Sequence, residues 1–154
     1  MVFHLIRNSS LVIMAYILIL EDNYLLAGHW QELLQSFGHE VIWCSTVAQA
    51  LKQVSSINFD LIITEMVIKN RSTLPFTSGG GLTLISQRAL GKLPAIPILG
   101  VSGHKPIANA SVKISLLEIA KDMGVDAALY KPIQPETLLH TVHTLLNCAQ
   151  VASA

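Results

Sequence analysis

Residues 15–22 read AYILILED, an apolar run that ends in an acidic pair. Two further apolar runs end in a charged residue in the same way, DLIITE at 60–65 and DAALYKP at 126–132. Short apolar runs with helical patterns between them indicate buried strands that alternate with helices, which predicts a doubly wound parallel α/β sheet. The carboxyl ends of parallel strands share one edge of the sheet, so the charged residues should converge there.

Five strands and five helices are expected. The expected strands are residues 15–20, 40–44, 60–64, 96–101 and 126–130. The expected helices are about 23–37, 46–54, 82–90 and 111–123, and a last one that begins near Pro135, with Ser45 as the N-cap of the second. We expect residues 1–13 to form an N-terminal extension, 14–148 a single domain and 149–154 a C-terminal tail.

The composition limits the classes of function. Of the 154 residues, 51% are hydrophobic and only 13% charged, as a buried parallel sheet requires. The net charge is zero and no Lys/Arg run occurs, which argues against nucleic-acid binding. The apolar run at 11–20 is too short to span a bilayer, so no membrane association is expected. Cys44 and Cys148 lack metal-ligand spacing, which favours a reducing cytoplasm and thiols without a bridge, although the spacing also permits a Cys44–Cys148 disulfide.

Four motifs occur together in this chain. They are ILILEDN (17–23), FDLIITEM (59–66), ILGVSG (98–103) and LYKPI (129–133). In this order they resemble the receiver domain of bacterial two-component response regulators, over about residues 14–148. The resemblance implies a CheY-like, flavodoxin-like fold: a three-layer sandwich whose five-stranded parallel sheet has the order 2-1-3-4-5.

The resemblance also implies an acidic pocket. Glu21 and Asp22 match the pair that holds Mg²⁺ in the family, and the backbone carbonyl of Val67 is a further candidate ligand, although Asp22 could instead cap the first helix. The family phosphorylates an aspartate after the third strand, where this chain has Glu65. Glutamate is longer by one methylene, about 1.5 Å in bond length, which displaces its oxygen from in-line attack. We therefore expect no efficient phosphorylation, and Mg²⁺ binding that is weak or absent. Glu65 then either replaces the phosphorylated state or marks a pocket kept only for binding.

Two more residues match the family's switch. Lys131 matches the pocket lysine and is expected to pair with Glu65, and the proline after it is usually preceded by a cis bond in the family. Ser102 matches the switch hydroxyl, although a plain turn serine is an equal alternative. The family's aromatic switch residue lies three positions before the lysine, where this chain has Ala128. Tyr130 is nearer to the lysine and is expected on the other side of the strand.

The implied function is signalling by contact. We expect a stand-alone receiver-like module, not an enzyme, that contacts a histidine kinase, a phosphotransfer protein or an effector. A homodimer through the fourth helix, fifth strand and fifth helix is a further expectation. The alternatives are a Mg²⁺-dependent phosphoryl-transfer or hydrolytic enzyme that uses Glu65 as nucleophile or base, and a flavin or nucleotide binder.

One segment departs from the family. KNRSTLPFTSGGG, residues 69–81, is longer than the family's loop and is expected to be an insertion that acts as a lid or a partner contact. Its SGGG end lacks the lysine of a phosphate-binding loop and is expected to be a flexible linker.

Overall fold

The computed structural model describes residues 13–68, 80–103 and 115–153. Five strands form one parallel sheet in the order β2-β1-β3-β4-β5, which confirms the predicted fold. The strands are β1 (Tyr16–Leu20), β2 (Glu40–Cys44), β3 (Leu61–Glu65), β4 (Ile98–Ser102) and β5 (Ala127–Tyr130). The helices are α1 (Tyr24–Ser36), α2 (Val47–Ser56), α3 (Gly81–Ala89), α4 (Leu116–Asp122) and α5 (Pro135–Ser153).

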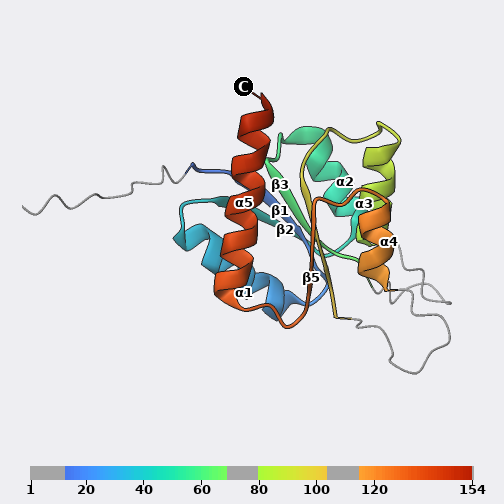
Figure 1. Cartoon of the computed structure of the whole chain (residues 1–154). Helices are drawn as coiled ribbons and strands as arrows, with labels where there is room; N and C mark the ends of the chain where they lie inside the picture. The colour runs from blue at the N-terminus through green and yellow to red at the C-terminus, as the bar shows by residue number, and fades with distance from the viewer. Residues whose placement is uncertain (1–12, 69–79, 104–114, 154) are drawn as a thin grey trace, which may run out of the picture.

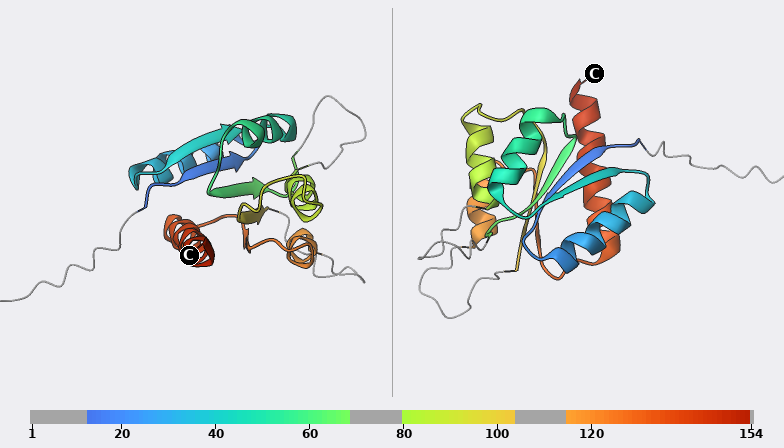
Figure 2. Two further views of the ribbon diagram at one scale, coloured as in Figure 1. Left: turned by 90° about the horizontal axis from the view of Figure 1, so that it is seen from above. Right: turned by 180° about the vertical axis from the view of Figure 1, so that it is seen from behind.

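Helices cover both faces of the sheet. Helices α1 and α5 lie on one face and α2, α3 and α4 on the other (Figures 1 and 2). In β1, Ile17 and Ile19 pack toward α1 and α5, whereas Leu18 and Leu20 pack toward the opposite helices. Because successive side chains of a strand point to opposite faces, a strand that is buried on both faces needs an unbroken apolar run. This explains the sequence of residues 15–20.

The starts of α1, α2 and α4 are fixed by side-chain caps. The Asn23 side chain accepts hydrogen bonds from the backbone of the first turn of α1, so Asn23 and not Asp22 is its N-cap. Thr46 caps α2, which corrects the predicted Ser45. Ser115 caps α4 with a complete capping box, so the helix begins at Leu116, later than the predicted start at 111. Residues 111–114 lie outside the described residues.

The described chain ends inside a helix. Helix α5 continues to Ser153, through most of the segment predicted as a tail, whereas residues 1–12 of the predicted extension lie outside the described residues. Cys44 is buried, Cys148 is exposed, and both are free thiols, as the sequence predicted. Among the described helices, none has the length and apolar character needed to cross a bilayer.

Candidate functional site

The strand register brings the predicted residues to one edge of the sheet. Leu20 pairs with Thr64, so Glu21 follows β1 at the level where Glu65 closes β3. Ser102 ends β4 and pairs with Tyr130, the last residue of β5, and Lys131 follows it. Groups from four strands therefore meet at the carboxyl edge of the sheet, as predicted.

Lys131 binds two carboxylates at once. Its Nζ lies 2.5 Å from Oε2 of Glu21 and 2.5 Å from Oε2 of Glu65. Both acids are buried, with 0% and 5% of their surface exposed. Their second oxygens are also bound, because the Asn23 N–H donates to Oε1 of Glu21 at 2.9 Å and the Val67 N–H donates to Oε1 of Glu65 at 3.2 Å. Every carboxylate oxygen of the pair thus accepts a hydrogen bond from the chain itself.

Burial and pairing shift the protonation of this cluster. Burial raises the pKa of the Glu21 carboxyl above its ordinary value, although the hydrogen bonds from Lys131 and Asn23 and the charge of Lys131 oppose the shift. Burial by itself disfavours the Lys131 ammonium, but hydrogen bonds and attraction from Glu21 and Glu65 outweigh it and raise the pKa of Lys131. Lys131 therefore stays protonated at neutral pH.

Both tryptophans touch this cluster. Lys131 Nζ lies 5.7 Å from the ring centroid of the buried Trp30, within cation–π range. Trp30 also lines the apolar groove between α1 and α5. The indole N–H of Trp43 donates to the backbone carbonyl of Glu21 at 2.7 Å. These contacts were not predicted, because no sequence motif includes either tryptophan.

Known proteins share this architecture. The sequence matches the family model of the response regulator receiver domain over residues 17–143, most of the chain. The chain belongs to the receiver domain family. A CheY-like receiver domain from Methanospirillum hungatei superimposes with a TM-score of 0.72 at 20% identity, and covers 91% of this chain and 99% of its own. The receiver domain of a LuxO repressor from Vibrio parahaemolyticus gives a TM-score of 0.70 at 20% identity, with 92% and 96% covered.

Two relatives carry more sequence similarity. A response regulator from Burkholderia pseudomallei, solved with a phosphorylated aspartic acid and a calcium ion, is 26% identical with a TM-score of 0.66, over 91% of this chain and 73% of its own. The CAI-1 autoinducer sensor kinase/phosphatase CqsS of Vibrio cholerae is 25% identical over 126 residues, 82% of this chain. The chain spans only 16% of the length of that sensor kinase.

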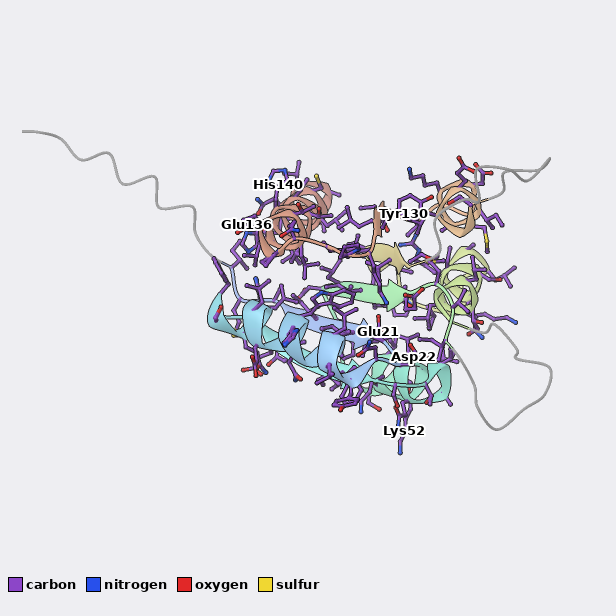
Figure 3. The ribbon with its side chains drawn as sticks, turned by 90° about the horizontal axis from the view of Figure 1, so that it is seen from below. Glu21, Asp22, Lys52, Tyr130, Glu136 and His140 are labelled. Atoms are coloured by element: carbon purple, nitrogen blue, oxygen red, sulfur yellow. The ribbon has the colours of Figure 1, made fainter. Side chains whose placement is uncertain are left out.

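The family's metal raises the question of whether these receiver residues fit Mg²⁺. Among the residues described, no group of three or more His, Cys, Asp or Glu side chains gathers in a way that could hold a metal ion. Asp22 is exposed and lies outside the buried pair, although it contacts Glu21 (Figure 3). The Val67 N–H faces Glu65, whose Oε2 is bound by Lys131. In this arrangement the residues do not fit a resident Mg²⁺.

The switch position of this receiver domain differs from the prediction. Ser102 is fully buried, and its carbonyl accepts the Lys131 N–H at 2.9 Å. Tyr130 and Ala128 pack against the same hydrophobic cluster, so the prediction that Tyr130 points to the other side was wrong. Residues two apart on a strand share a face, which is the physical reason. The Tyr130 hydroxyl hydrogen-bonds Ser115 Oγ, the N-cap of α4, and Figure 3 shows the tyrosine beside that helix.

The end of the insertion lies directly against the pocket backbone. A Cβ on Gly80 would come within 2.8 Å of the Met66 carbonyl and the Ile68 nitrogen. A Cβ on Gly81 would come within 2.9 Å of the Glu65 carbonyl and 2.8 Å of a Thr64 methyl. At these two positions glycine permits close packing, which corrects the flexible-linker prediction. Residues 69–79, predicted as a lid or partner contact, lie outside the described residues.

Proposed function

We propose that this receiver domain is a signalling module that works through protein–protein contact without phosphorylation of Glu65. The observation that carries the proposal is the Lys131 ammonium, held 2.5 Å from both Glu21 and Glu65. In the family the acidic pocket serves a phosphorylated aspartate, whereas here its carboxylates are already paired. A module of this kind is not an enzyme.

The state of Glu65 argues against nucleophilic attack on a phosphodonor. An attacking carboxylate needs an accessible oxygen in line with phosphorus. Oε2 of Glu65 is bound to Lys131, Oε1 accepts the Val67 N–H, and the residue is 5% exposed. The related protein from Burkholderia pseudomallei carries its phosphoryl group on an aspartic acid, and β3 of this chain ends in glutamate.

The proposed partners are those of two-component systems. Similarity to part of a sensor kinase/phosphatase supports a histidine kinase, a phosphotransfer protein or an effector as the partner class. The proposed location is a reducing cytoplasm, where the free thiols of Cys44 and Cys148 would persist. The surface formed by α4, β5 and α5 is the proposed contact, for a partner or for a second copy. The β5 side chains are all partly exposed and are therefore within reach of a partner.

The test is exposure to acetyl phosphate with Mg²⁺, followed by intact-protein mass spectrometry. We expect no added phosphoryl group on the wild type. Glu65→Asp shortens the side chain by about 1.5 Å, which loosens its contact with Lys131 and restores the family's acceptor, so this variant should be phosphorylated. Glu136→Asp, the same change on the exposed first turn of α5, is the matched control and should stay unmodified. A phosphoryl group on wild-type Glu65 would overturn the proposal.

The same samples separate two forms of the proposal. With beryllofluoride as a phosphoryl analogue, oligomeric state is measured by light scattering. If the wild type is dimeric without analogue and Glu65→Asp becomes dimeric only with it, Glu65 acts as a permanent substitute for the phosphorylated state. If the wild type is monomeric and unresponsive whereas Glu65→Asp responds, the fold serves as a binding scaffold.

A further inference from the structure

We propose that Lys131 is the resident cation of the acidic pocket, in the role that a divalent metal has in the family, and that the wild-type pocket does not take up Mg²⁺. A corollary is that removing the Lys131 charge creates a Mg²⁺ site at Glu21 and Glu65. The inference extends the proposed function, but it concerns metal binding alone and is tested without any phosphodonor.

The first argument is charge. Glu21 is fully buried and Glu65 nearly so, and an isolated buried carboxylate is strongly unfavourable unless it is paired. Among the residues that the structure describes, the cation in contact with both is Lys131, whose Nζ lies 2.5 Å from each. An ammonium has three N–H donors. Two are used by the carboxylates, and the Trp30 ring at 5.7 Å adds a cation–π contact.

The second argument is space. Mg²⁺ requires near-octahedral oxygen ligands at about 2.0–2.1 Å. Oε2 of Glu21 and Oε2 of Glu65 are both in contact with Lys131. A metal ion between them would be within a few ångströms of the ammonium, where like charges repel. The other oxygen of each carboxylate, Oε1, accepts a hydrogen bond from a backbone N–H.

The third argument is reach. Both acids are glutamates, and each is longer than aspartate by about 1.5 Å of chain. The added length lets the side chains of Glu21, after β1, and Glu65, at the end of β3, meet a single lysine that follows β5. The two glutamates therefore act together: they place both negative charges on the chain's own cation. The raised pKa of Lys131 agrees with this, since its ammonium keeps its charge across the neutral range.

The experiment is a Mg²⁺ titration of the whole chain by isothermal titration calorimetry, with tryptophan fluorescence in parallel because Trp30 contacts Lys131. The variant is Lys131→Met, which keeps an apolar chain of similar length and removes the charge. The matched control is Lys52→Met, on the exposed side of α2, where the lysine extends into solvent (Figure 3). We expect no saturable binding to the wild type or the control at concentrations up to about 10 mM, above the weak end of protein Ca²⁺ sites. Lys131→Met should bind with at least tenfold greater affinity and gain thermal stability from Mg²⁺.

Each result decides the proposal. Saturable millimolar binding of Mg²⁺ to the wild type overturns it, even if Glu65 proves unreactive toward acetyl phosphate. A folded Lys131→Met protein that ignores Mg²⁺ overturns the corollary. If Lys131→Met is unfolded without Mg²⁺ and folds when Mg²⁺ is added, the corollary is supported. If that variant does not fold with or without Mg²⁺, Lys131→Gln, which keeps N–H donors without the charge, takes its place under the same criteria.

Discussion

Lys131→Met should destabilise the fold by about 3–5 kcal/mol, the usual cost of removing one partner of a buried ion pair. The variant leaves Glu21 and Glu65 buried without a counter-charge. The Lys131 side chain is 19% exposed, so water can reach part of the site and the lower half of that range is expected. A surface ion pair would cost less than about 1 kcal/mol.

Urea unfolding followed by far-UV circular dichroism measures the loss. With a slope of about 2 kcal/mol per molar urea, a loss in the lower half of that range, about 3–4 kcal/mol, moves the midpoint by about 1.5–2 M. Lys52→Met, the exposed control, should change the free energy of unfolding by less than about 0.5 kcal/mol. Adding Glu65→Gln to Lys131→Met should recover part of the loss, because one of the two unpaired carboxylates is then gone.

The refuting result is a small effect. If Lys131→Met loses less than about 1 kcal/mol, the ammonium is solvated and the pocket is not held by a buried cation. If the second substitution recovers nothing, the loss comes from packing against Trp30 and not from charge.

Three further predictions use the same assays. Gly81→Ala should lower the free energy of unfolding by about 1–3 kcal/mol, because the added Cβ overpacks the site. Gly28→Ala, with open space around it in α1, should be neutral or stabilising. Equal effects of the two substitutions would contradict this. Tyr130→Phe should lower the free energy of unfolding by about 0.5–1.5 kcal/mol and speed amide exchange in α4, because Ser115 loses its hydrogen bond to the tyrosine hydroxyl. Unchanged amide exchange in α4 would contradict this prediction. The raised pKa of Glu21 means that the folded state binds this proton more tightly, so its contribution to stability falls as pH rises from about 4.5; Glu21→Gln should remove this component of the slope.

Much of the fold follows from local patterns. A strand buried on both faces must be apolar throughout, so runs such as 15–20 marked the strands, and the charged residues at their ends marked the edge where the site forms. The starts of the helices were harder to predict than the strands, because several polar residues near each start can act as the N-cap. Ser45 and Thr46 are adjacent and chemically alike, and the structure shows that the Thr46 side chain accepts the Gln49 N–H and caps α2.

The details of the site depend on distances that sequence does not contain. A lysine opposite Glu65 was predicted, but that the same ammonium also binds Glu21 depends on where three side chains end. Tyr130 was placed on the wrong face although strand alternation determines its side. Predicting the hydrogen bond between Tyr130 and Ser115 would have required the correct start of α4. The sequence pattern placed that start several residues too early.

The size of the ion-pair energy bears on how such a domain could signal. Two conformations that differ by a few kcal/mol are shifted only by a ligand with a comparable difference in affinity for them. Removing one partner of a buried ion pair costs about 3–5 kcal/mol, which is comparable to such a difference. We propose that the contact between Lys131 and Glu65 biases the chain toward one conformation. A partner would therefore meet one conformation, and its regulation would lie in the partner's own concentration or state.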